Sequence, residues 1–221
     1  MPNQIARKSR IEPQSTQDRI LDVALDQFSR LGFERVTMAG IAKAARVAPA
    51  SLHYHFLDKE DLWRKAMLQL RAVIEQEEQL LQAASQEASA LSLLRMAMRL
   101  FLHLSWKHPA LGRIVMLEGM AGGERLAWLN QHLIGPRNRR LAKLVARAIK
   151  DGDLKPFPPA QVVITLQMAA AGLINLAPLM RLSFSIDPYA SDARAAHEQM
   201  IIDAILGGLT LKNTATEANH V

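Results

Sequence analysis

The chain has 221 residues, of which 49% are hydrophobic and 5% aromatic, with no cysteine and a net charge of +6. The lack of cysteine excludes a disulfide framework, a thiolate nucleophile and a zinc or iron–sulfur site with cysteine ligands. Residues 1–60 hold 9 Lys and Arg against 7 Asp and Glu. The positive charge is therefore spread along the chain and does not by itself indicate a nucleic-acid partner.

This length suits one large domain or a small domain joined to a larger one, and the Ala-, Leu-, Met- and Gln-rich composition favours helices. Residues 1–14 contain Arg7, Lys8 and Arg10 but lack the apolar stretch of a secretory signal. We expect them to form a flexible basic arm, residues 212–221 to form a flexible tail, and the protein to be cytoplasmic.

Three short helices are predicted within residues 15–57. The first is capped by Ser15 and ends at Gly32, which tolerates a left-handed conformation. The second starts after Thr37 and ends near residue 45. The third covers about residues 48–56, with Pro49 at its first position, where a missing N–H costs nothing.

Longer helical patterns fill residues 58–211. They cover about 58–86, where Asp58 is the cap, and then 89–107, 109–120, 124–150, 159–182 and 191–209. Gly135 and Pro136 are expected to kink or split the fourth of these helices. The sequence therefore predicts an all-α fold, in which a three-helix domain of residues 15–57 joins a larger helical domain of residues 58–211 without a flexible linker.

The segment from Thr37 to Phe56 has the spacing of a helix-turn-helix. The residues spaced to pack inward are Ile41, Ala45, Val47, Leu52 and Phe56, which leaves most of the second helix for another surface. No acidic residue lies between Glu34 and Asp58, whereas Arg35, Lys43 and Arg46 are basic. A surface that faces phosphates has this charge pattern.

Residues 16–62 resemble the TetR family of transcriptional regulators. The positions that fall on the family pattern are Ile41, Ala42, Val47, Leu52, Tyr54, His55, Phe56, Lys59 and Leu62. The resemblance implies a repressor that binds double-stranded, near-palindromic operator DNA as a homodimer and is released by a small-molecule effector. It implies that residues 15–57 form the helix-turn-helix DNA-binding domain and residues 58–211 the helical effector-binding and dimerisation domain. It also implies a DNA-binding residue set, namely Thr37, Arg46, Pro49, Ala50, Ser51, His53, Tyr54, His55 and Lys59.

Within this set, the resemblance assigns Thr37 and Lys59 to phosphates. It places Ser51 and His53 at base edges, Pro49 and Ala50 at thymine methyls or sugars, and Tyr54 and His55 at backbone oxygens. For each side chain, plain exposure or packing is the alternative.

Four residues depart from the family pattern. Arg46 stands where glycine is usual, and Ala48 where a capping serine is usual. A left-handed non-glycine residue and a lost cap each cost on the order of 1 kcal/mol. Gly40 replaces an acidic residue that usually pairs with the Thr37 cap, and His53 replaces a tyrosine. A phosphate contact from Arg46 would offset its strain.

Residues 156–180 contain no charged side chain. A membrane span is one reading, but Gln161, Gln167, Asn175 and the prolines at 158, 159 and 178 argue against it, and we expect no membrane association. A helix that is apolar on most sides must be buried on most sides, partly against the core of its own subunit and partly against another molecule. We expect a second copy of the chain, which would also pack against the apolar stripe of the last helix.

An effector pocket is expected between the helices of the larger domain. The candidate lining residues are Phe101, His103, Trp106, Met116, Met120, Trp128, Met168 and Asn175. Plain core packing is the alternative for each apolar member. The basic run from Arg137 to Lys150 is expected to be a solvated helix face, with a second nucleic-acid contact or an acidic ligand as its alternative.

An enzyme is not expected, because no set of reactive groups converges. His53 and His55 point to different sides of a helix, as do His103 and His108, so neither pair can bind one metal ion. No metal site and no cofactor is predicted. The alternative function is a helical protein-interaction module with a vestigial helix-turn-helix. The departures from the family pattern at Arg46 and Ala48 are the reason to keep this alternative.

Overall fold

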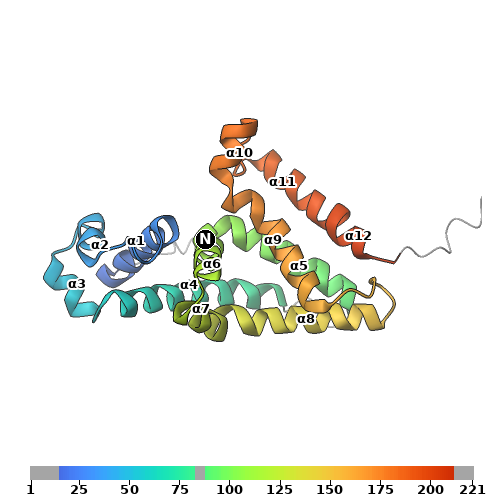
Figure 1. Cartoon of the computed structure of the whole chain (residues 1–221), viewed down its shortest axis with the longest axis horizontal. Helices are drawn as coiled ribbons and strands as arrows, with labels where there is room; N and C mark the ends of the chain where they lie inside the picture. The colour runs from blue at the N-terminus through green and yellow to red at the C-terminus, as the bar shows by residue number, and fades with distance from the viewer. Residues whose placement is uncertain (1–14, 83–87, 212–221) are drawn as a thin grey trace, which may run out of the picture. The chain divides into compact units, whose positions relative to one another are not determined.

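The computed structural model describes residues 15–82 and 88–211, so the expected N-terminal arm and C-terminal tail lie outside the described residues. The chain divides into two compact units between Gln69 and Leu70. This division falls inside helix α4 (Lys59–Gln82), whereas the sequence places the domain boundary before that helix. Figure 1 labels the helices of both units.

The first unit contains α1 (Thr16–Leu31), α2 (Met38–Ala45), α3 (Pro49–His55) and the first part of α4. The Ser15 side chain accepts a hydrogen bond from Asp18 N at 3.0 Å, and Gly32 ends α1 at φ 77°. The predicted starts and stops of α1 and α2 are therefore confirmed. The core of this unit contains fully buried side chains, among them Ile20, Phe28, Ile41, Leu52, Phe56, Leu62 and Trp63.

The second unit contains the rest of α4 and all later helices. These are α5 (Ala90–Lys107), α6 (Pro109–Ala121), α7 (Glu124–Leu129), the π-helical turn η1 (Asn130–Ile134), α8 (Gly135–Lys150), α9 (Pro159–Asn175), α10 (Ala177–Phe184), α11 (Ser191–Gln199), the π-helical stretch η2 (Met200–Leu206) and α12 (Gly207–Leu209). The described residues contain helices and one isolated β-bridge, between Leu154 and Thr210. The all-α prediction is confirmed.

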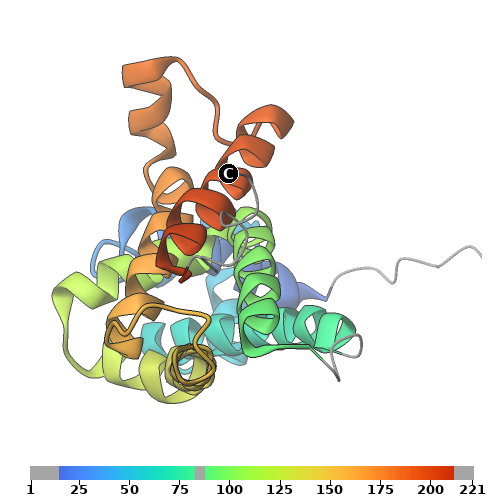
Figure 2. The same ribbon diagram turned by 90° about the vertical axis from the view of Figure 1, so that its right-hand side faces the viewer.

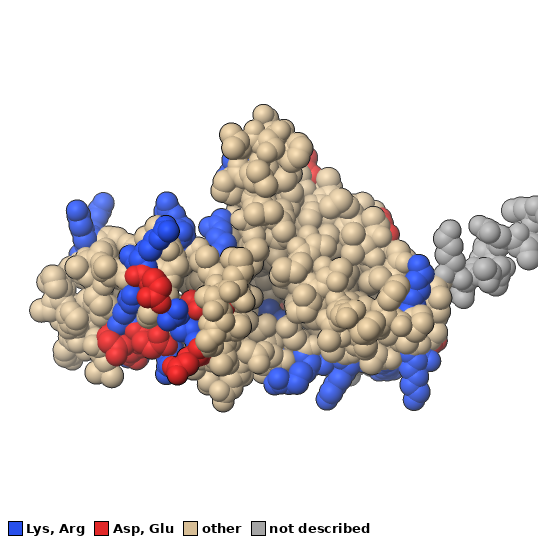
Figure 3. Space-filling view, in the orientation of Figure 1, with Lys and Arg blue, Asp and Glu red and all other residues tan. Residues whose placement is uncertain are grey.

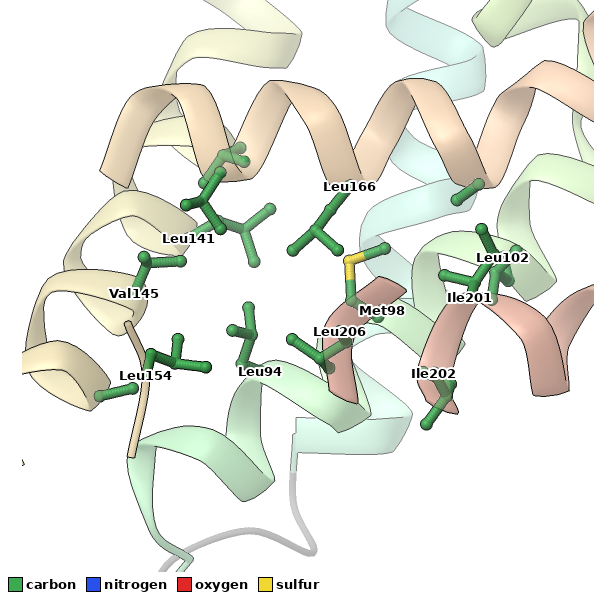
Figure 4. Packing of buried hydrophobic residues seen from close by; sticks show 14 of the residues in the cluster. Leu94, Met98, Leu102, Leu141, Val145, Leu154, Leu166, Ile201, Ile202 and Leu206 are labelled. Carbon is green, nitrogen blue, oxygen red and sulfur yellow. The ribbon is translucent and has the colours of Figure 1, made fainter. Parts of the chain in front are cut away.

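The core of the second unit lies where α5, α8, α9 and η2 pack together (Figure 4). The buried side chains of this core include Leu94, Met98 and Leu102 from α5, Val145 from α8, Leu166 from α9, and Ile201 and Leu206 from η2. By contrast, α10 and the start of α11 project from this core in both ribbon views (Figures 1 and 2). Among the residues that the structure describes, no helix covers much of α10.

Two predicted long helices differ from the structure. The helix expected over residues 159–182 is broken at Leu176, and α9 and α10 are bent by 63°. Pro178 explains the break, because it lies in the first turn of α10 and cannot donate to the end of α9. The helix expected over residues 124–150 contains the π turn η1 just before Gly135, so it splits where the Gly135–Pro136 pair predicts.

No single helix of the described residues is both long enough and apolar enough to span a membrane. Only the bent pair α9 and α10 together reaches that length and composition.

Candidate nucleic-acid interface and internal cavity

The turn between α2 and α3 is built by backbone hydrogen bonds and one strained residue. Arg46 adopts the left-handed conformation at φ 55° and ψ 47°, and its N–H donates to Lys43 O at 3.2 Å. Val47 N then donates to Ala42 O at 3.0 Å. This confirms that Arg46 occupies a position whose backbone favours glycine.

Both helices of the motif start at the predicted residues, but only one is capped by a side chain. The Thr37 hydroxyl accepts a hydrogen bond from Gly40 N at 3.1 Å, whereas Ala48 offers no capping group to α3. A Cβ atom added at Gly40 would lie 3.0 Å from the Thr37 hydroxyl oxygen. The Thr37 cap therefore fits closely against a residue without a side chain at position 40.

The inward and outward faces of α3 divide as the spacing predicts. Leu52 and Phe56 are buried. Pro49, Ala50 and His53 are exposed, and Tyr54 is 85% exposed. Ser51 and His55 are half-buried. The His55 ring lies edge-on to Tyr54, with 5.1 Å between the ring centroids. A row of exposed polar, aromatic and small side chains is thus held by a buried leucine and phenylalanine.

The charged groups around this face are those that suit a polyanion. Arg35, Lys43 and Arg46 are exposed, and the segment between Glu34 and Asp58 contains no acidic residue. The resulting surface attracts phosphates without an acidic side chain within the segment to oppose them.

Lys59 has a role inside the first unit that the sequence does not reveal. Its ammonium donates to Phe33 O at 3.0 Å and lies 4.3 Å from the centre of the Phe33 ring. Lys59 therefore holds the loop that precedes α2. An ammonium has three donors, so a phosphate contact would use those that remain.

The start of α4 is fixed by two carboxylates. Asp58 accepts a hydrogen bond from Asp61 N at 2.8 Å, which confirms it as the cap. Asp61 accepts hydrogen bonds from Lys65 at 2.8 Å and from Leu57 N at 3.1 Å. Burial disfavours the charge on Asp61, but these hydrogen bonds outweigh burial and lower its pKa. Lys65 also donates to His55 O at 3.2 Å, so it ties the end of α3 to α4.

The second unit contains a cavity of about 100 Å³. It is lined by residues of α4, α5, α6, η1, α8 and α9, and most of its surface is apolar. Its polar lining groups are Ser105, His108, Arg137, Asn138, Gln167 and Asn175. Gln167 donates to Asn138 at 2.9 Å, and the Asn175 amide lies 3.0 Å from the sulfur of Met116.

Comparison with known proteins connects both units to one family. Residues 20–66 match the family model described as bacterial regulatory proteins, tetR family. Residues 91–205, more than half of the chain, match the model described as tetracyclin repressor-like, C-terminal domain. The chain belongs to the TetR family. Members of this family are transcriptional regulators and not enzymes.

Curated TetR-family relatives match over the N-terminal segment. The regulator AcrR of Shigella flexneri is 46% identical over 59 residues, which are 27% of each chain. UidR of Escherichia coli K12 is 40% identical over 58 residues, covering 26% of this chain and 30% of UidR. The chain thus spans less than a third of the length of these relatives in the matched region.

Solved TetR-like structures resemble nearly the whole chain in fold. The ketosteroid transcriptional regulator KstR2 of Mycobacterium tuberculosis superposes with a TM-score of 0.71 at 17% identity, covering 91% of this chain and 98% of that one. A regulator from Saccharomonospora viridis in complex with choline gives 0.63 at 17% identity, covering 89% and 98%. At these identities the likeness shows the fold alone.

Of the effector-pocket residues expected from the sequence, the structure places Phe101, Met168 and Asn175 in the cavity lining. Met116 is not among the lining residues, although its sulfur lies 3.0 Å from the Asn175 amide. Met120 is 76% exposed and lines no part of the cavity. A helical pattern alone cannot separate these cases, because cavity-lining and core residues share the same spacing.

The other three expected pocket residues also lie away from the cavity and need correction. Trp106 is buried in the core and donates to Pro188 O at 3.1 Å. Trp128 stacks on His132 with 4.5 Å between ring centroids. His103 is largely exposed, 3.5 Å from Glu77. Each of these side chains is already occupied by another partner.

His108 and Arg137 line the cavity, although neither was among the pocket residues expected from the sequence. Arg137 belongs to the basic run of α8, whose other members, Arg139, Arg140, Lys143, Arg147 and Lys150, are exposed. Figure 3 shows Lys and Arg side chains along the lower edge of the surface. Arg137 lies one turn before buried Leu141, on the apolar face of α8. That i, i+4 relation to an apolar position is the signal that separates it from the solvated run.

Proposed function

We propose that this TetR-family regulator binds double-stranded operator DNA through α2 and α3. The observation that supports the proposal is the outward face of α3, where exposed Ala50, His53 and Tyr54 stand on buried Leu52, in a segment without acidic residues. A helix with this arrangement can present side chains to base edges in the major groove. Exposed Lys43 and Arg46 then supply phosphate contacts.

The protein acts on DNA as a homodimer in this proposal. The apolar side chains left exposed on α9 and α10 support it: Ile164, Leu179, Leu182 and Phe184 are 49 to 86% exposed. In Figure 3 the surface over α10 has few charged side chains. An apolar surface of this kind marks an interaction site. A second copy would cover it and would present two copies of α3 to two half-sites.

We propose further that the protein is a repressor. Binding of a small molecule in the cavity of the second unit then releases the protein from its operator. Helix α4 begins in the first unit, contributes Ile74 to the cavity and continues beyond it. A ligand that prefers one position of α4 would therefore bias the DNA-binding unit.

A gel-shift and footprinting experiment on the DNA upstream of the chain's own gene tests DNA binding. We expect a dimeric, salt-sensitive complex on a near-palindromic site. His53→Ala should change base preference at one or two positions, whereas Lys43→Ala should weaken binding to every sequence alike. Arg30→Ala removes an exposed basic side chain from α1 and serves as the control, with affinity unchanged.

Sequence-independent binding would contradict a specific regulator. Complete lack of DNA binding by the folded protein would instead favour the interaction module with a vestigial helix-turn-helix. Lys59→Ala is a poor phosphate probe, because Lys59 also supports the Phe33 loop.

A further inference from the structure

The cavity in the second unit has an uneven charge. Within the described residues, its lining contains the basic side chains His108 and Arg137 and no Asp or Glu. The remaining polar groups are the hydroxyl of Ser105 and the amides of Asn138, Gln167 and Asn175. A cationic ligand would meet no carboxylate in the lining itself, whereas an anion would meet two nitrogen-bearing side chains able to donate to it.

Both basic groups are bound to neighbouring glutamates of α4. His108 Nε2 lies 3.0 Å from Glu77, which Lys107 also contacts at 2.9 Å. Arg137 Nη2 pairs with Glu78, and both side chains are mostly buried. These contacts attach the C-terminal part of α4 to α5, α6 and α8. Whatever binds His108 and Arg137 therefore acts on the groups that hold α4.

Arg137 lines more than one cavity of the second unit. It contributes to the cavity of about 100 Å³ and to two others, of about 170 Å³ and about 60 Å³. Glu78 lines both of the others but not the first. A guanidinium binds a carboxylate best through two parallel N–H donors, so a ligand carboxylate in the first cavity would draw donors of Arg137 away from Glu78.

The volume limits the size of the apolar part of a ligand. A buried cavity of about 150 Å³ holds benzene, so by proportion about 100 Å³ suits an apolar body of roughly four to six carbons when part of it reaches the opening. Phe101, Leu104, Leu111, Val115 and Ile134 supply the apolar lining for such a body.

Resting on the effector-release function proposed above, we propose that the effector is a small carboxylic acid with an apolar body, bound as the carboxylate by Arg137 and His108. The carboxylate competes with Glu78 for Arg137 and with Glu77 for His108. Binding thereby weakens the attachment of α4 to α8 and to the α5–α6 corner. Release of DNA follows from that loss.

Calorimetric titration of the full-length protein tests the ligand class. Pentanoate, hexanoate and benzoate are the probes, with hexanamide, benzamide and hexylamine as matched neutral and cationic compounds. We expect the acids to bind at least about tenfold more tightly than their amides, since a charge-assisted hydrogen bond replaces a neutral one. Equal affinity for acid and amide, or preference for the amine, would overturn the proposal.

Three variants separate ligand recognition from structural support. Glu78→Gln removes the competitor of the ligand and should tighten hexanoate binding by about tenfold. The double variant Arg137→Gln with Glu78→Gln removes both members of the pair, so no buried charge is left alone, and it should lose hexanoate binding while staying folded. Glu75→Gln, on an exposed site of α4, is the control. Unchanged affinity in Glu78→Gln would contradict the competition.

Operator binding by the ligand-free protein is measured in parallel by gel shift. Specific DNA binding without any acid binding overturns the ligand class and leaves the regulator function standing. Acid binding with no specific DNA binding overturns the regulator function instead. Acid binding that leaves the DNA complex intact overturns the proposed coupling through α4.

Discussion

Arg46 is the residue where local strain and function meet. Its left-handed backbone costs about 1 kcal/mol relative to a glycine there. This conformation ends α2 and turns the chain toward α3. A basic side chain at this exposed turn is explained if it contacts a phosphate. The strain would then be offset only when DNA is bound.

Arg46→Gly is accordingly expected to stabilise the first unit while weakening DNA binding. The free energy of local opening of α2 and α3, measured by amide hydrogen exchange, should rise by up to about 1 kcal/mol. The extra freedom of glycine in the unfolded chain reduces this gain in part. The slope of log affinity against log salt should fall in magnitude by about one. A variant with unchanged salt dependence would show that Arg46 contacts no phosphate.

At the scale of the single helix, the start of α3 lacks a side-chain cap. Ala48→Ser would give the hydroxyl oxygen needed to accept a hydrogen bond from the first turn of α3. We expect stabilisation of the first unit by about 1 kcal/mol, visible as a higher denaturant midpoint with an unchanged slope. Ala50→Ser, at the second position of the helix, is the control and should not stabilise it.

The attachment of α4 is expected to depend on pH through Glu77. Hydrogen bonds from His108 and then Lys107 lower the pKa of Glu77 from 4.5 to about 2. Because the folded-state pKa lies below the unfolded one, the carboxylate contributes stability that is complete above pH 4.5 and is lost as the pH falls toward 2.

Comparison of the wild type with Glu77→Gln isolates this contribution. The wild type should melt at a higher temperature near pH 6, and the difference in Tm should shrink as the pH falls below about 4.5. Glu75→Gln, which changes an exposed carboxylate of the same helix, should show a much smaller difference. A Tm difference for Glu77→Gln that stays constant across this range would contradict the assignment.

At the scale of the whole molecule, the apolar surface of α9 and α10 is proposed to be the homodimer interface. Leu182 is 86% exposed, so Leu182→Glu should leave the fold of one subunit intact. We expect the variant to be monomeric by light scattering and to bind the operator at least about tenfold more weakly, because each half-site is then bound alone. Arg139→Glu, on the exposed face of α8, is a control that also changes charge. A dimeric Leu182→Glu protein would place the interface elsewhere.

The sequence by itself determined the all-α fold, the caps of α1 and α2, and the faces of α3. These features depend on contacts between near neighbours in the chain. Ser15 caps α1 by accepting a hydrogen bond from Asp18 N, and Thr37 caps α2 by accepting one from Gly40 N. The one-turn spacing of Leu52 and Phe56 selects the buried side of α3. The left-handed backbone of Arg46 was anticipated from the resemblance to the TetR family, in which glycine is usual at this position.

Only the tertiary structure decided where the cavity lies and which side chains line it. Arg137 meets Glu78 across 59 positions, and the Trp106 indole meets Pro188 across 82. Apolar periodicity identifies a buried face but does not say whether that face meets side chains or empty space. The sequence pattern was enough to name Phe101, Met168 and Asn175 as candidates for the cavity. The roles of His108 and Arg137 became visible only when distant helices were packed together.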